Sequence, residues 1–119
     1  MARILVAEDE EILRSMLVHA LTARGHEVVA AADGGIALDR LAAQPFDLLI
    51  ADIVMPVMDG VALALKASAE HPLLKIVMMT GYVDEKRRAH NLEALIHAVI
   101  AKPFAMEDMA RLVDAALAG

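Results

Sequence analysis

The sequence predicts a single α/β domain, a three-layer sandwich in which a doubly wound parallel sheet of five strands lies between helices. Three observations support this fold class. Five short apolar runs are rich in branched side chains and show no polar alternation, which is typical of strands buried on both faces. A segment with apolar residues at helical spacing follows each run, so the order is strand then helix, five times. Finally, 119 residues, 59% of them hydrophobic, suffice for one sizeable core.

The predicted strands are each about four residues long. Right-handed helical crossovers between parallel strands favour the strand order 2-1-3-4-5, in which the first and third strands are neighbours. The runs are Ile4–Ala7, Val28–Ala31, Leu48–Ala51, Ile76–Met79 and Val99–Ala101.

The predicted helices alternate with the strands and end at recognisable signals. The first ends before Gly25, where a helix commonly takes a left-handed cap, and Pro45 stops the second. The third predicted helix ends at His71-Pro72, and the fourth is the most polar of the five. In the fifth, the acidic residues Glu107 and Asp108 fall in the first turn, where negative charge is favourable. The helices are expected at Ile12–Leu21, Ile36–Ala43, Val61–Glu70, Asp84 to about Leu92, and Met106–Leu117.

Composition and charge exclude several classes of protein. The 17 acidic and 11 basic residues give a net charge of −6, which argues against binding nucleic acid through a broad basic face. The absence of cysteine excludes disulfides, thiolate metal sites and cysteine nucleophiles. No apolar run approaches the ~20 residues that span a bilayer, and no signal peptide is recognisable. We therefore expect a cytoplasmic protein without a membrane partner, with one domain over residues 1–119 and no effector domain.

Acidic side chains follow two strands that the expected order makes neighbours. Glu8 and Asp9 come directly after the first strand, and Asp52 follows the third. Parallel strands end at the same edge of the sheet, where ligands bind in this fold class, so these carboxylates are expected to meet. A bound cation would relieve their repulsion, and ligands that are all oxygen favour Mg²⁺. Glu10 and Glu11 are explained by the favourable position of acids at a helix N-terminus.

Two further polar residues end strands at the same edge of the sheet. Thr80 follows the fourth strand and Lys102 the fifth. Each alone has a simple explanation, since a lysine at a strand end commonly extends its ammonium group to solvent. Beside a magnesium site, however, an ammonium group and a hydroxyl are suited to holding phosphoryl oxygens.

Together these motifs resemble the receiver domain of two-component response regulators, and the similarity covers essentially the whole chain. The separations of 28 residues from Asp52 to Thr80 and 22 from Thr80 to Lys102 are also those of the family. The resemblance implies the flavodoxin-like or CheY-like form of the predicted fold, in a stand-alone, single-domain response regulator. The motifs are Glu8-Asp9, Asp-Ile-Val-Met-Pro-Val-Met-Asp-Gly at 52–60, Thr80-Gly81 and Lys102-Pro103.

The resemblance also implies a chemistry. Asp52 would take a phosphoryl group from the phosphohistidine of a sensor histidine kinase or histidine phosphotransfer protein, becoming a 4-aspartylphosphate. Mg²⁺ would be held by Asp9, Asp52 and the backbone carbonyl of Val54, with Glu8 acting through water. The protein would be a bacterial signalling module and not an enzyme. The only reactions it would catalyse are the transfer of phosphate to itself and the slow loss of that phosphate.

Lys102 and the Thr80 hydroxyl would complete the catalytic set by holding phosphoryl oxygens. In the family, the threonine shifts inward on phosphorylation and biases a face made of the fourth helix, fifth strand and fifth helix. We expect the downstream protein to bind this face.

Some positions depart from the family pattern or carry further expectations. The residue three before Lys102, usually aromatic and coupled to the threonine, is Val99, so the usual aromatic switch is absent. Tyr82 is expected to cover the site, and the peptide bond before Pro103 to be cis. Gly60 is interpreted as freeing the backbone after the phosphorylation loop.

Two other functions remain as alternatives. A Mg²⁺-dependent phosphohydrolase with Asp52 as nucleophile would usually carry a second acid two residues later, where this chain has Val54. A flavodoxin-like FMN binder would need an anion cradle after the first strand, where four acids stand instead. Turnover of a phosphoester would indicate the first, and a yellow colour the second.

Two outputs are open for a stand-alone receiver. One is a shuttle or motor-type regulator that acts when phosphorylated. The other is a protease adaptor like the CpdR group of alphaproteobacterial cell-cycle regulators, whose unphosphorylated form primes the ClpXP protease. The stretches that resemble this group are Ile4–Asp9, Ala51–Pro56 and Met79–Tyr82.

Overall fold

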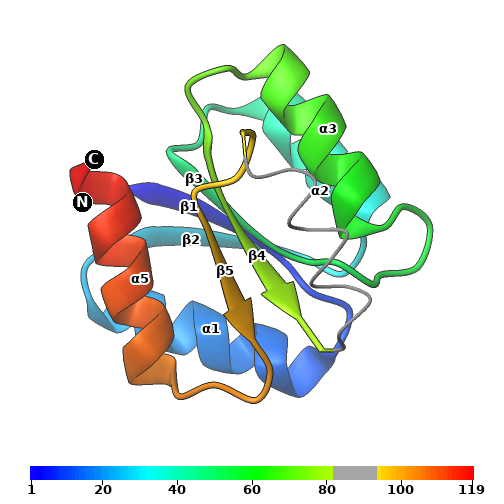
Figure 1. Cartoon of the computed structure of the whole chain (residues 1–119). Coiled ribbons are helices and arrows are strands. Elements are labelled where there is room, and N and C mark those ends of the chain that lie inside the picture. Colours follow the sequence, from blue (N-terminus) through cyan, green and yellow to red (C-terminus); the bar gives the residue numbers. More distant parts are fainter. Residues whose placement is uncertain (82–93) are drawn as a thin grey trace.

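In the computed structural model of the chain, five parallel strands form one sheet with helices on both faces (Figure 1). The structure describes residues 1–81 and 94–119. The strand order is β2-β1-β3-β4-β5, which confirms the predicted fold class and order. The elements are β1 (Arg3–Ala7), α1 (Glu11–Ala23), β2 (Glu27–Ala31), α2 (Gly34–Ala43), β3 (Leu48–Asp52), α3 (Gly60–Glu70), β4 (Lys75–Thr80), β5 (Ala98–Ala101) and α5 (Met106–Ala118).

The helices form two layers, with α1 and α5 on one face of the sheet and α2 and α3 on the other (Figure 1). Successive side chains of a strand point to opposite faces. In β1, Ile4 and Val6 therefore pack in the layer of α1 and α5, whereas Leu5 and Ala7 pack in that of α2 and α3. This two-sided burial explains why the strands read as continuous apolar runs.

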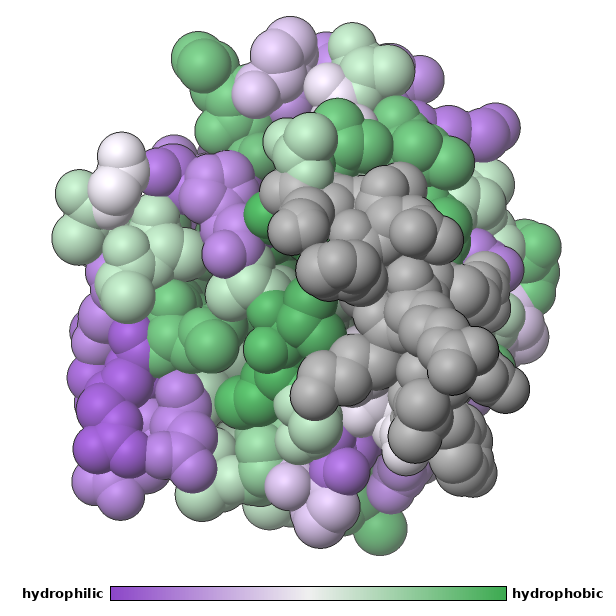
Figure 2. Space-filling view, viewed as in Figure 1, coloured by the Kyte–Doolittle hydropathy of each residue, from purple (hydrophilic) through white to green (hydrophobic). Residues whose placement is uncertain are grey.

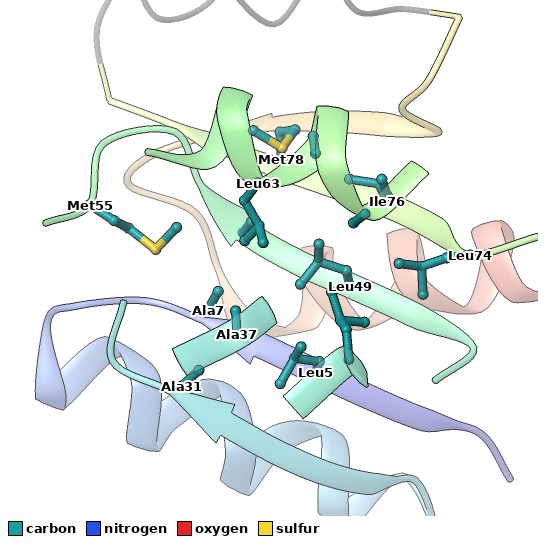
Figure 3. Packing of buried hydrophobic residues seen from close by; sticks show 14 of the residues in the cluster. Leu5, Ala7, Ala31, Ala37, Leu49, Met55, Leu63, Leu74, Ile76 and Met78 are labelled. Atoms are coloured by element: carbon teal, nitrogen blue, oxygen red, sulfur yellow. The ribbon is translucent and has the colours of Figure 1, made fainter. Parts of the chain in front are cut away.

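Figure 3 shows the cluster between the sheet and helices α2 and α3. Leu5 of β1, Leu49 of β3 and Leu63 of α3 are fully buried in it. Burying a side chain of this size stabilises the fold by about 1.5–3 kcal/mol. The strands that end at the carboxylates are thus anchored in a packed core.

Specific residues begin or end the helices. The side chain of Asp33 accepts a hydrogen bond from the Ile36 amide at the start of α2, and that of Asp59 accepts one from the Ala62 amide at the start of α3. Gly25 has φ +92°, which confirms the predicted left-handed residue after the first helix. The predicted helix over residues 84–92 and the covering role of Tyr82 lie outside the described residues.

The surface in the orientation of Figure 1 is divided by polarity. Figure 2 shows hydrophilic residues gathered on the outer side of α5, with an apolar area between α5 and β5. Among the residues that the structure describes, no helix has both the length and the apolar character needed to cross a membrane.

Candidate functional site

The predicted site residues lie together at the carboxyl edge of the sheet. The register of β1 against β3 places Glu8, the residue after β1, next to Asp52 at the end of β3. β4 ends at Thr80, whose carbonyl accepts a hydrogen bond of 2.7 Å from the Lys102 amide. Strand pairing therefore brings the ends of β1, β3, β4 and β5 to one place, as the predicted strand order requires.

Three carboxylates meet at this edge. Glu8, Asp9 and Asp52 each contribute one oxygen to a group in which these oxygens all lie within 4.8 Å of one another. Glu8 and Asp52 are buried and Asp9 is exposed. Partial burial, a hydrogen bond with Glu8 and the negative charge of Glu8 raise the pKa of Asp9 above its usual value. The expected repulsion between the acids is therefore present in the folded chain.

Lys102 bridges two of these acids. Its Nζ donates hydrogen bonds to Asp52 Oδ2 at 2.6 Å and to Glu8 Oε1 at 2.8 Å. Burial by itself would lower the pKa of Lys102, but the hydrogen bonds and negative charges of the two acids outweigh it and raise that pKa. The side chain is therefore an ammonium at neutral pH. Counted with their formal charges, the three carboxylates and the one ammonium among the described site residues give a net charge of −2.

The ligand atoms fit a hard divalent cation. All of them are oxygens, and a six-coordinate Mg²⁺ with bonds of about 2.1 Å places opposite ligands about 4.2 Å apart. The three carboxylate oxygens lie within 4.8 Å of one another, close enough together to hold such an ion. A divalent cation would also neutralise the net charge of the group. Val54 lies at the half-exposed mouth, where its amide donates to Asp52 Oδ1 at 3.3 Å, and the use of its carbonyl as a ligand stays a prediction.

The other predicted residues occupy the expected positions. Thr80 is buried at the end of β4, and the phosphoryl contact of its hydroxyl stays a prediction. The Lys102–Pro103 peptide bond is cis, as expected. Val99 of β5 packs partly buried against the core cluster on the side of α2 and α3.

One residue at the site was not singled out from the sequence. Arg14, in the first turns of α1, donates from Nη1 to the backbone carbonyls of Glu8 at 3.0 Å and Asp9 at 3.3 Å. These hydrogen bonds connect the backbone of Glu8 and Asp9 to helix α1, which follows them. A basic residue one turn into a helix that begins after an acidic pair is the sequence signal that could have identified it.

Gly60 has a different role from the expected one. Among the described glycines only Gly25 has a positive φ, so Gly60 does not supply unusual backbone freedom. A Cβ atom at position 60 would instead lie 2.1 Å from the backbone oxygen of Asp52, and the Gly60 amide donates to the Ile53 carbonyl at 2.7 Å. The glycine is required because α3 begins directly against the end of β3.

A groove of about 600 Å³ opens beside Asp52 and Lys102, between α1 and the chain that leads into α5. Ile12, Met16 and Val54 line it with exposed apolar side chains, and Ile12 is 71% exposed. A larger groove of about 830 Å³ lies at the opposite edge of the sheet, and none of the predicted site residues lines it.

The family model of the response regulator receiver domain matches residues 4–114. The chain belongs to this family. It is 39% identical over 114 residues to the response regulator receiver protein CpdR of Brucella abortus (strain 2308), and the match covers 96% of this chain and 95% of that protein.

Solved structures of receiver domains agree with the fold. A CheY-like response regulator receiver domain protein from Methanospirillum hungatei JF-1 superposes with a TM-score of 0.91 at 30% identity, covering 99% of this chain and 94% of that one. Response regulator protein TrrA from Thermotoga maritima, crystallised in complex with Mg²⁺-BeF, gives a TM-score of 0.86 at 29% identity over 97% of this chain and 98% of that one.

Membership of the family establishes the function at a coarse level. Receiver domains are signalling modules of two-component systems, and they bind Mg²⁺ at an acidic pocket. The group of Glu8, Asp9 and Asp52 resembles that pocket.

Proposed function

We propose that the chain is the phosphoacceptor of a two-component phosphorelay and that Asp52 carries the phosphoryl group. The observation that best supports this is the position of Asp52, whose carboxylate lies at the base of an open groove with Lys102 Nζ 2.6 Å away. A nucleophilic carboxylate needs such a cation, because the group that it attacks is itself negatively charged.

The proposed step exchanges one bond to phosphorus for another. A carboxylate oxygen of Asp52 forms a bond to phosphorus while the bond from phosphorus to the donor's imidazole nitrogen breaks, and the electron pair stays with that nitrogen. With acetyl phosphate the breaking bond is to oxygen and acetate leaves. Written with Asp52 as a carboxylate, the step takes no proton from it. Bound Mg²⁺ would supply electrostatic stabilisation of the phosphoryl oxygens.

The residues around Asp52 have proposed roles that follow from their positions. Asp9 and Asp52, with the Val54 carbonyl, would hold the cation, and Glu8, the third acid of the group, would act through water. Lys102 would donate a hydrogen bond to a phosphoryl oxygen from its place beside Asp52. Thr80, at the end of β4, would bind a phosphoryl oxygen through its hydroxyl and so report phosphorylation.

The partners of the site follow from this chemistry. We propose a sensor histidine kinase or histidine phosphotransfer protein as donor, in the cytoplasm, and the apolar groove along α1 gives such a donor a surface next to Asp52. We propose that the downstream protein binds a face made of the fourth helix, β5 and α5, of which the structure describes β5 and α5. The apolar area between α5 and β5 supports this face (Figure 2).

The finer proposal for the output is a CpdR-like protease adaptor. It is supported by the similarity to CpdR of Brucella abortus, which extends over nearly the whole of both chains. An adaptor that acts unphosphorylated would retain ClpXP in a pull-down when Asp52 is replaced by alanine. A regulator that acts only when phosphorylated would lose its partner in the same variant.

Intact mass after incubation with acetyl phosphate and Mg²⁺ tests the phosphoacceptor proposal. We expect one added phosphoryl group in the wild type and in the control Asp39→Ala, an exposed acid of α2. We expect none in Asp52→Ala or in the presence of EDTA. Addition to the Asp52→Ala protein would refute the assignment of the acceptor, and continuous release of phosphate from a phosphoester would favour the phosphohydrolase.

A further inference from the structure

Arg14 contacts three consecutive residues at the carboxyl edge of the sheet. Its side-chain Nη1 donates to the backbone carbonyls of Glu8 at 3.0 Å and Asp9 at 3.3 Å. Its own amide donates to the Glu10 carbonyl at 2.9 Å, in the bond that closes the first turn of α1. One arginine therefore holds the backbone of the turn that carries two of the three acids.

The backbone of this turn depends on Arg14 for two reasons. Glu8 is 0% exposed, so solvent cannot satisfy its carbonyl and a donor inside the protein is needed. Within the described residues, Glu10 is the N-cap of α1 but makes no side-chain cap hydrogen bond, although such a bond is the usual way to fix a helix start. Removal of the Arg14 side chain would leave the Glu8 carbonyl buried without that donor.

The two bases at this edge use their charge differently. Lys102 donates to carboxylate oxygens of Glu8 and Asp52, whereas both hydrogen bonds that the structure gives to the Arg14 side chain go to backbone carbonyls. Arg14 thus acts on the backbone that carries the Asp9 carboxylate and not on the carboxylate itself. Because Asp9 is exposed, packing orders its side chain little, and the direction of that side chain toward Asp52 depends on its backbone.

We propose that Arg14 is a positioning residue for the cation site, which fixes the backbone of the acidic turn so that the Asp9 carboxylate lies toward Asp52 before a cation arrives. This inference rests on the proposed use of these two acids as ligands. Order that exists in advance spares the cation the cost of arranging its ligands and raises its affinity. The positive charge of Arg14 has the opposite effect, because it repels a cation. The sign of the change in affinity on removal of Arg14 therefore decides between the two effects.

The first experiment compares Arg14→Met, Arg14→Lys and the control Arg24→Met. Methionine is a long, unbranched residue without charge or N–H donor. Arg24 lies at the other end of α1 and donates to Asp114, so its loss removes a contact of the same helix away from the acids. The Mg²⁺ dissociation constant is measured by NMR titration of the amide shifts, without phosphodonor and at constant ionic strength.

We expect Arg14→Met to raise the dissociation constant about tenfold, the equivalent of one lost charge-assisted hydrogen bond. Arg14→Lys should fall between wild type and Arg14→Met, because both bonds leave from a single nitrogen and an ammonium can replace them in part. Arg24→Met should bind Mg²⁺ like the wild type.

Amide hydrogen exchange without Mg²⁺ tests the same contact in the absence of any cation. The Glu10 amide donates to Glu8 Oε2 at 3.0 Å across the turn that Arg14 holds. We expect this amide to exchange about tenfold faster in Arg14→Met than in the wild type, and to be unchanged in Arg24→Met.

Several results would overturn the proposal. Tighter Mg²⁺ binding in Arg14→Met would show that the arginine acts only through its charge, and unchanged binding would show that it has no part in the site. An equal loss of affinity in Arg24→Met would assign the effect to helix stability in general. Unchanged exchange at Glu10 in Arg14→Met would refute the hold on the turn.

Failure of the proposed function gives different results. A wild type that binds no Mg²⁺ would refute the proposed cation site and with it the effect of Arg14 on affinity. A wild type that binds Mg²⁺ but accepts no phosphoryl group would refute the phosphoacceptor function alone, and the titrations and the exchange at Glu10 would still decide the role of Arg14.

Discussion

Replacing Gly60 by alanine should damage both the fold and the proposed phosphorylation site. The new Cβ would lie 2.1 Å from the backbone oxygen of Asp52 and 2.9 Å from the Cα of Ile53, where real Cβ atoms essentially never come closer than 3.0 Å. The start of α3 and the end of β3 must therefore separate by about 0.9 Å. The contact is with backbone, so no side-chain rotation can relieve it.

The size of the effect follows from two opposing contributions. Overpacking costs typically about 1–3 kcal/mol, and a rigid backbone contact belongs at the upper end. Alanine recovers up to about 1 kcal/mol through its higher helix propensity. We expect a net loss of about 2 kcal/mol, which for a domain of this size lowers the melting temperature by roughly 8 °C. A displacement near 1 Å at Asp52 should also slow its phosphorylation by about 10²-fold.

Thermal unfolding and intact-mass kinetics with acetyl phosphate measure these effects. Gly35→Ala is the matched control, because its Cβ would meet only side-chain atoms, Val57 Cγ1 at 3.2 Å and Asp33 Oδ1 at 3.3 Å, in the first turn of α2. We expect its melting temperature to stay within about 2 °C of wild type. The reasoning is refuted if Gly60→Ala melts and reacts like the wild type, or if Gly35→Ala loses as much stability as Gly60→Ala.

Three further predictions concern single residues. Asp9→Asn removes a carboxylate that Glu8 repels, so without Mg²⁺ the variant should melt at a higher temperature than wild type. Addition of Mg²⁺ should not raise the melting temperature of the variant further. A variant that melts below wild type would contradict this prediction. The pKa of Asp9 is raised in the folded chain, so the difference in melting temperature between Asp9→Asn and wild type should shrink as pH falls through that pKa. The difference should vanish below the ordinary value of 3.8, which thermal melts from pH 7 to 3.5 would measure. Val57 is 83% exposed and has φ +71°, a left-handed backbone conformation that asparagine adopts more easily than valine. Val57→Asn should therefore stabilise the fold by about 1 kcal/mol in urea titrations. Unchanged stability would show that the backbone at this position is not strained.

Much of the fold could be predicted because the strands are buried on both faces. All five residues of β3 are buried, and a short run of this kind is typical of a central strand of a parallel sheet. Once the strand order followed from crossover handedness, Glu8 and Asp52 had to lie side by side, and Thr80 and Lys102 had to lie at the same edge. The residues that meet at this edge could therefore be predicted from the sequence.

Side-chain contacts across the site could not be predicted in the same way. Lys102 and Glu8 are 94 residues apart in the chain, and only their rotamers decide that they touch. The close approach of Gly60 to the end of β3 depends on how α3 packs, and nothing in the local sequence distinguishes it from a simple turn glycine. Strand register determines which residues meet at the sheet edge, whereas packing determines which atoms form contacts.

The charges at this edge indicate that one partly buried lysine would not suffice for the proposed phosphorylation of Asp52. Among the residues that the structure describes, three carboxylates face one ammonium, and an incoming phosphoryl group would add further negative charge beside Asp52. At an effective dielectric constant of about 20, two unit charges 4 Å apart interact by about 4 kcal/mol. The net charge of −2 thus opposes the phosphoryl group until a divalent cation cancels it. Lys102 has three N–H donors, and within the described residues two of them donate to Glu8 and Asp52. The third could therefore donate to a phosphoryl oxygen while the lysine keeps its place.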